Sequence, residues 1–172
     1  ASTSGVETSQ LLTVDAPTGR ALILVADSGE NSIVVVPGAN DLCPPGIPQT
    51  GDIVLTQLEV PLSSVGATLH DARAVGATTI LNPAPARELT PDLLECVDVI
   101  VPNQHELELL GGVTSLLDAG VGSVIVTLGA DGARIHTRDA VIDIPTLKVD
   151  SVDTTGAGDT FCGYLASGLA TG

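Results

Sequence analysis

Short apolar runs recur along this chain, and most are bounded by proline, glycine, asparagine or aspartate. Their length and their aliphatic, β-branched character are typical of buried strands. The predicted strands are 53–58, 78–82, 98–101, 123–128, 133–137 and 140–145. The predicted helices between the first four strands are Pro61 to about Val75, 91–97, 104–110 and 115–119. This alternation predicts an α/β fold, with a parallel sheet covered by helices on both faces.

The first part of the chain departs from this alternation. Two strand-like runs, 21–26 and 32–36, are separated only by turn-forming residues at 27–31, which favours a β-hairpin. We therefore divide the chain into a small β element with its flanking segments, residues 1–40, and an α/β core over residues 41–172.

Polar residues stand at or just past the ends of several predicted strands. They are Glu59, Asn82, Asn103 and Thr127. Right-handed crossovers bring the carboxyl ends of parallel strands to one edge of the sheet, and ligands of open α/β folds bind at that edge. We expect these side chains to lie there together.

The sequence VDTTGAGDTF at 152–161 precedes apolar residues at helical spacing, so it predicts a loop running into a helix. The small residues Gly156, Ala157 and Gly158 would leave the first N–H groups of that helix uncovered. An anion such as a phosphate could bind there, because the helix dipole is positive at this end. Asp159, next to that anion, would suit a general base acting on a hydroxyl that attacks phosphorus.

A purely structural explanation of these residues stays open on spacing alone. Asp153 or Thr155 could cap the helix, and Asp159 could complement its dipole. Two other phosphate motifs are excluded. A P-loop needs Gly-Lys-Ser/Thr, but the only lysine, Lys148, is followed by valine, and Phe161 stands where a dinucleotide fingerprint needs its third glycine.

Composition narrows the possible ligands. Six basic residues against 21 acidic ones give a net charge of −15, which argues against nucleic acid and against an anionic membrane surface. A polyanion such as ATP would have to be bound by backbone amides and metal ions. The cysteines, Cys43, Cys96 and Cys162, are widely spaced and odd in number, which predicts buried thiols in a reducing, cytoplasmic setting.

An ordered series of motifs resembles the phosphofructokinase-B type sugar kinases, the family that includes the ribokinases. The segment 153–161 resembles the family's second signature, and further motifs follow the family's order along essentially the whole chain. They are PTG (17–19), GEN (29–31), PGAN (37–40), QLE (57–59), NPAPA (82–86), PNQHE (102–106) and TLGADG (127–132). The resemblance implies a ribokinase-like α/β fold. It also implies that the hairpin is a lid that closes over the sugar and pairs with a second subunit in a homodimer.

The resemblance implies an ATP-dependent kinase acting on a pentose, most closely on the 5-hydroxyl of D-ribose. Asp159 would be the catalytic base and would contact both sugar and nucleotide. Gly156, Ala157 and Gly158 would form the anion hole for the transferring phosphoryl group. Glu59 would hydrogen-bond sugar hydroxyls.

The same resemblance implies the remaining ligand contacts. Asn103 and Glu106 would support the arrangement of Mg²⁺ and phosphate. The residues lining ATP would further include Thr127, Leu128, Gly129, Ala130, Asp131 and Gly132. Asp153, through its side chain, and Thr155, through its carbonyl, would hold an activating K⁺.

Simpler explanations compete for several of these residues. Asn103 and Glu106 could only form a capping box, Gly129 and Gly132 could only form a turn, and Glu59 could be a solvated loop acid. The family's N-terminal third and C-terminal end are missing from the series, so we expect this segment alone to be inactive. The alternative functions are another sugar or nucleoside kinase of the family, for example a fructokinase-like one, or a non-catalytic fragment or binding module.

Overall fold

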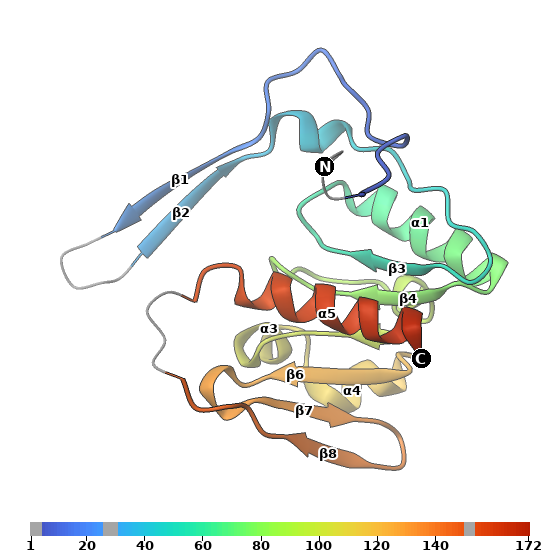
Figure 1. Ribbon diagram of the computed structural model, residues 1–172, viewed down its shortest axis with the longest axis vertical. Helices are drawn as coiled ribbons and strands as arrows, with labels where there is room; N and C mark the ends of the chain where they lie inside the picture. The colour runs from blue at the N-terminus through green and yellow to red at the C-terminus, as the bar shows by residue number, and fades with distance from the viewer. Residues whose placement is uncertain (1–4, 26–30, 150–153) are drawn as a thin grey trace.

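The computed structural model describes residues 5–25, 31–149 and 154–172 (Figure 1). It contains two separate sheets. β1 (Arg20–Val25) and β2 (Asn31–Val36) form an antiparallel pair, which confirms the predicted hairpin; the turn between them lies outside the described residues. The larger sheet has the order β3-β4-β5-β6-β7-β8. Its strands are Ile53–Thr56, Thr78–Leu81, Val99–Ile100, Ser123–Thr127, Ala133–His136 and Val141–Ile144.

The larger sheet is mixed. Its first four strands are parallel, as predicted, whereas β7 and β8 pair antiparallel with their neighbours. A parallel neighbour needs a long crossover connection. Only residues 128–132 separate β6 from β7, and only 137–140 separate β7 from β8. These connections are too short for a crossover, so the chain reverses direction at each and the strands pair antiparallel.

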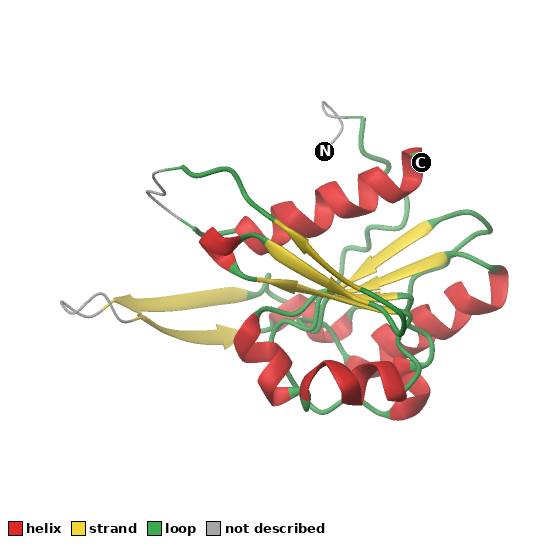
Figure 2. Ribbon diagram, turned by 90° about the horizontal axis from the view of Figure 1, so that it is seen from below, coloured by secondary structure: helices red, strands yellow, loops and turns green. Residues whose placement is uncertain are grey.

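Helices cover both faces of this sheet, as the alternation predicted. The helix that ends at the C-terminus, α5 (Ala157–Thr171), lies alone on one face, and the other α-helices lie on the opposite face (Figure 2). These are α1 (Leu62–Val75), α2 (Pro91–Leu94), α3 (Gln104–Leu109) and α4 (Gly112–Asp118). No helix in the described part of the chain is long and apolar enough to cross a membrane.

Two apolar clusters hold these layers together. Successive residues of a strand point to opposite faces, so β4 sends Leu81 into the larger cluster under α1, α2 and α4, and Ile80 into the smaller cluster under α5. Both side chains are fully buried. The next segment does the same with Ile100 and Val101. The centre of the sheet is therefore buried on both faces, as its near-continuous apolar strands predicted, whereas β8 is exposed along its whole length.

Helix boundaries follow the turn residues. α1 begins directly after Pro61 and ends at Val75. Its C-cap, Gly76, has a left-handed φ of 74°, a conformation that glycine adopts readily. Two boundaries differ from prediction by three residues each. α2 ends at Leu94 rather than Val97, because single turns replace the last helical residues, and α4 begins directly after Gly111 rather than at Ser115.

The hairpin of β1 and β2 projects away from the larger sheet (Figure 1). Leu22 and Leu24 of β1 are 59% and 65% exposed, and Val34 and Val35 of β2 are exposed as well. Alternation along the strands places apolar side chains on both faces of this ribbon. A two-stranded ribbon that is apolar on both faces needs other surfaces to cover it.

The cysteines are free thiols, and one expectation about them is wrong. Cys96 and Cys162 are buried as predicted, whereas Cys43 is exposed. Cys43 directly follows the short 3-10 helix Gly38–Leu42, none of whose residues is buried. This segment lies at the surface, so Cys43 is exposed although its side chain is apolar.

Candidate active site

The N-terminus of α5 is open. Its N-cap is Gly156, with a left-handed φ of 74° and no side chain to cap the helix, and Asp153 lies outside the described residues. Apart from the adjoining residues and the backbone of the helix itself, a Cβ added at Gly156 or Gly158 would meet no atom of the described residues within 4 Å. Space therefore lies against the backbone at this positive helix end, as an anion site requires.

One of the three predicted anion-hole amides has a partner in the protein. The N–H of Ala157 donates to the carbonyl of Thr154 at 3.1 Å. An anion bound here would have to take over that donor, whereas Gly156 and Gly158 present their backbone to the open space.

A cavity of about 170 Å³ joins this helix end to the carboxyl edge of the sheet. Asn82, Asn103 and Thr127 line it, as the positions of their strands predicted. The helix contributes residues 156–159 to the same wall. Residues from four separate segments thus meet at one edge, and the expectation of a shared edge is confirmed for these three side chains.

Glu59 is not among the residues that line this cavity. It is exposed in the loop after β3, and the preceding side chain, Leu58, is fully buried. Gln57 reaches the site from the same loop instead, because its amide donates a hydrogen bond to Asp159. Sequence reasoning missed Gln57 as a site residue, because the strand was predicted to run to residue 58, whereas β3 ends at Thr56.

A second cavity, of about 270 Å³, adjoins the first. The two share Thr127, Ala157 and Gly158, so the start of α5 lies where they meet. The second cavity is walled mainly by small and apolar residues of β6, β7, β8 and α5 and of the loops beside these strands. They include Gly129, Gly132, Ala133, Ile144, Pro145 and Phe161. A concave, mostly apolar site of this kind suits a flat ring system with few polar contacts.

Of the residues 127–132, which were predicted to line the nucleotide, some line this cavity and others do not. Gly129 and Gly132 line the cavity, whereas Leu128 packs against the larger core cluster, and Ala130 and Asp131 are exposed outside the lining. Gly132 also has a structural role. Its φ is 93°, and a Cβ there would lie 2.1 Å from the carbonyl oxygen of Ile144, so the turn requires glycine as well.

Asn103 and Glu106 form a capping box at the start of α3. The Glu106 N–H donates to Asn103 Oδ1, and the Asn103 N–H donates to Glu106 Oε2, both at 2.8 Å. The structural explanation of this pair is therefore correct. Both residues also line the smaller cavity, so the cap holds the Glu106 carboxylate rigidly at the site.

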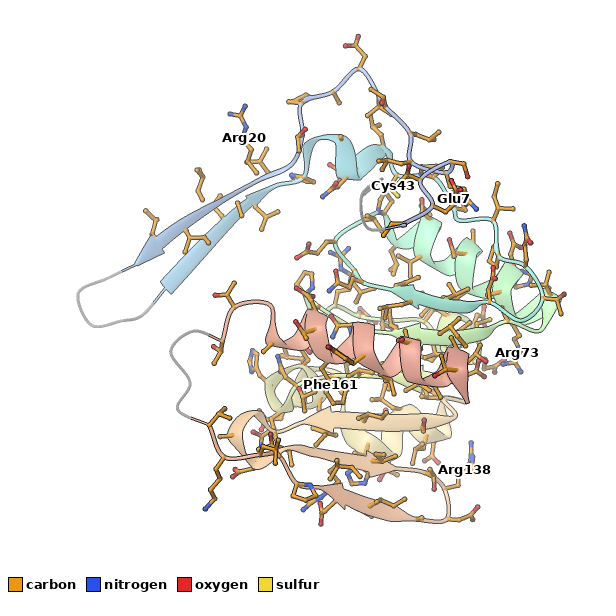
Figure 3. The ribbon with its side chains drawn as sticks, viewed as in Figure 1. Glu7, Arg20, Cys43, Arg73, Arg138 and Phe161 are labelled. Atoms are coloured by element: carbon orange, nitrogen blue, oxygen red, sulfur yellow. The ribbon has the colours of Figure 1, made fainter. Side chains whose placement is uncertain are left out.

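The smaller cavity is acidic. Asp159 and Glu106 line it, and its lining contains no Lys or Arg. Among the labelled cations, Arg73 and Arg138 lie toward the end of the molecule where α5 finishes, away from the start of that helix (Figure 3). A polyanion in this cavity would depend on backbone amides, the helix dipole and added cations.

The donor set fits Mg²⁺ as a partner of phosphate. Mg²⁺ usually takes one or two carboxylates together with phosphate oxygens and water. Glu106 offers one such carboxylate in the cavity. Within the described residues no group of three or more His, Cys, Asp or Glu side chains could hold a metal alone.

Cys162 lies one helical turn after Asp159 and lines the same cavity. Burial raises the pKa of its thiol, and the negative charges of Asp159 and Glu106 raise that pKa further. The thiol and the two carboxylates thus share one cavity.

The site has an open helix end with a carboxylate on its first turn, at the carboxyl edge of a largely parallel sheet. These features are typical of the class of α/β proteins that bind anionic ligands at a helix N-terminus. Within that class, residues 1–172 match the model of the pfkB family of carbohydrate kinases, and the chain belongs to this family.

Individual relatives agree with this assignment. The chain is 38% identical to a ribokinase of Staphylococcus aureus, with 95% of this chain and 60% of the relative aligned. It is also 38% identical to a deoxyribokinase of Salmonella typhi, over 86% of this chain and 55% of the relative. The structure of Arabidopsis thaliana ribokinase complexed with ribose and ATP is 29% identical, with a TM-score of 0.79 over 90% of this chain and 57% of that one. The chain thus spans less than two thirds of each relative, and the resemblance seen in its motifs is confirmed.

The cysteines should differ in reactivity. At pH 7 we expect iodoacetamide to alkylate Cys43 at least about tenfold faster than Cys162, because the thiolate is the nucleophile and a raised pKa makes it scarce. Peptide mass spectrometry over a time course on the full-length native protein measures both rates. In urea the two rates should converge. Equal rates in the native protein would contradict the burial of Cys162.

Proposed function

We propose that the full-length protein is an ATP-dependent kinase that transfers the γ-phosphoryl group to the 5-hydroxyl of D-ribose, giving ribose 5-phosphate. The observation that carries this proposal is the position of Asp159, on the first turn of α5 where two cavities meet. Ribokinases among the relatives support the choice of sugar. The free thiols suit the reducing cytoplasm, where we assign the reaction.

The chemistry that we assign to this helix end is in-line transfer. Asp159 is exposed, so a substrate hydroxyl can reach its carboxylate and lose its proton to it. The N–H groups of Gly156, Ala157 and Gly158 would stabilise the negative charge of the transferring phosphoryl group. The acid and the amides belong to consecutive residues, so one rigid helix start would hold both.

ATP would span the two cavities. Its base and ribose would occupy the apolar cavity beside Gly129, Gly132 and Phe161. Its phosphates would pass Thr127, which lines both cavities, and reach Asn103 and the start of α5. Leu128, Ala130 and Asp131 would contribute by shaping the turn over this cavity.

Two cations would offset the charge of ATP in this acidic site. Mg²⁺ would neutralise the phosphate oxygens, supported by the rigidly capped Glu106. We assign an activating K⁺ to the Asp153 side chain and the Thr155 carbonyl, next to the anion hole. Glu59 would hydrogen-bond sugar hydroxyls from the loop after β3.

The hairpin of β1 and β2 would act as a lid over the sugar and pair with a second subunit. Its exposed Leu22, Leu24 and Val35 support this role, because two apolar faces need two partners. One face would cover the substrate, and the other would bury area in a homodimer.

A kinase assay tests the function directly. With the full-length protein, ATP and Mg²⁺, we expect D-ribose to give the highest kcat/KM in a panel with 2-deoxyribose, fructose and adenosine, and we expect K⁺ to raise turnover. 2-Deoxyribose is included because a deoxyribokinase is among the relatives. Preference for another sugar would change the substrate and keep the mechanism. ATP binding without turnover on any of them would favour the binding module.

Asp159→Asn should lower kcat by about 10²- to 10⁴-fold, because an amide cannot accept the proton of the attacking hydroxyl. ATP affinity, measured by calorimetry, should stay within a few-fold of wild type. The exposed acid Asp139 at the β7–β8 turn supplies the matched control, Asp139→Asn, with unchanged kcat. A kcat for Asp159→Asn above about a tenth of wild type would remove Asp159 from the role of base.

Charges on the hairpin should dissociate the dimer. We expect Leu22→Lys combined with Leu24→Lys to convert the full-length protein to a monomer in sedimentation velocity, because unpaired charges in an apolar interface are costly. Leu147→Lys, at a leucine that is 84% exposed away from the hairpin, should leave the dimer intact. A wild type that is monomeric at micromolar concentration, or a double variant that stays dimeric, would refute this pairing.

A further inference from the structure

Gln57 holds one oxygen of Asp159. Its Nε2 donates to Asp159 Oδ1 at 2.7 Å, across 102 positions of sequence. Gln57 stands just past the end of β3, and Asp159 stands on the first turn of α5, so the bond connects the sheet edge to the open helix end. Both residues also line a third cavity, of about 310 Å³, on the β3 side of α5.

A short chain of hydrogen bonds fixes the direction of the Gln57 amide. Asn82 Nδ2 donates to the carbonyl of Val101 at 2.9 Å, within the buried part of the sheet. Because that carbonyl can only accept, the Asn82 amide must point its oxygen the other way. Asn82 Oδ1 accordingly accepts from Gln57 Nε2 at 3.2 Å.

The same logic carries over to Asp159. Gln57 must present its NH₂ group to Asn82, and this group has two N–H donors. One donor goes to Asn82 and the other to Asp159. The buried main-chain carbonyl of Val101 therefore sets the orientation of Asn82, then that of Gln57, and finally that of the Asp159 carboxylate.

We propose that Gln57 is a positioning residue for the base, an inference that rests on the proposed kinase function. Gln57 occupies Oδ1, which assigns Oδ2 of Asp159 to proton acceptance. Asp159 is exposed on an open helix turn, so without this bond its carboxylate would sample several rotamers. A base must lie within hydrogen-bond reach of the proton that it takes, and a displacement of about 1 Å can cost roughly 100-fold in rate.

A purely structural role is the competing explanation. Gln57 could simply tie α5 to the edge strand β3, which lies beside it (Figure 1). Such a tie would affect stability and leave the chemical step alone. Gln57→Met separates the two roles, because methionine keeps the length of the side chain and removes both donors. A positioning role predicts a loss of kcat, and a structural tie predicts a loss of stability.

The test uses the full-length protein. Gln57→Met should lower kcat by about 10- to 100-fold, with KM for ribose and for ATP within about twofold of wild type and the Tm unchanged. Gln49→Met, at an exposed glutamine in the loop before β3, is the matched control and should keep the wild-type kcat. A Gln57→Met variant with wild-type kcat would overturn the proposal, as would one in which only Tm falls.

A double-mutant cycle shows whether Gln57 acts through Asp159. In an Asp159→Asn background, Gln57→Met should cost little further kcat, because the base that it positions is already gone. Losses that multiply would overturn the proposal.

The same measurements distinguish a failure of this proposal from a failure of the proposed kinase function. A wild type that phosphorylates no sugar would overturn both, whereas an active wild type with an active Gln57→Met variant would overturn the positioning role alone. If Gln57→Met does not fold, the side-chain amide protons of Gln57 give a second measurement. Their NMR resonances should shift between wild type and Asp159→Ala, and unchanged resonances would contradict the bond.

Discussion

The packing of α5 across one face of the sheet is the constraint on which the rest of the site depends. Cys162 is its buried anchor, and Phe161, Leu165 and Ala166 pack beside it against Ile80, Val101 and Ile125 of the sheet. This contact brings the open helix start over the carboxyl edge of the strands. A shift of one helical turn, about 5.4 Å, would remove Asp159 from Gln57 and would separate both cavities from the helix end.

The second constraint is charge. The proposed ligand, ATP, is a polyanion, whereas the chain has a net charge of −15 with few side-chain cations, and the cavity at the helix end contains two carboxylates. The compensating positive charge must then come from aligned backbone dipoles and bound metal ions. Glycine suits this arrangement, because it exposes the backbone directly. In so acidic a chain, the glycine-rich helix start would therefore supply positive charge that side chains do not.

Structural and functional explanations coincide at several positions. The box of Asn103 and Glu106 caps α3, and the same bonds hold a carboxylate in the cavity. Gly132 is required by a turn that brings the chain within contact of Ile144, and the same glycine lines the apolar cavity. Competing explanations drawn from sequence were therefore not exclusive. A local rule fixes the backbone, and the fixed backbone then presents the atoms that line the cavities.

The sequence by itself determined what depends on local pattern: the parallel strands and their helices, the hairpin, the capping box, and the glycines and aspartate that begin α5. These features follow from periodicity and turn chemistry within a few residues. Only the tertiary structure decided that Gln57 reaches Asp159, that Leu128 packs against the core cluster, and that Cys43 is exposed. Such contacts join residues as much as 102 positions apart. They depend on strand register and on the placement of one helix, which no local pattern encodes.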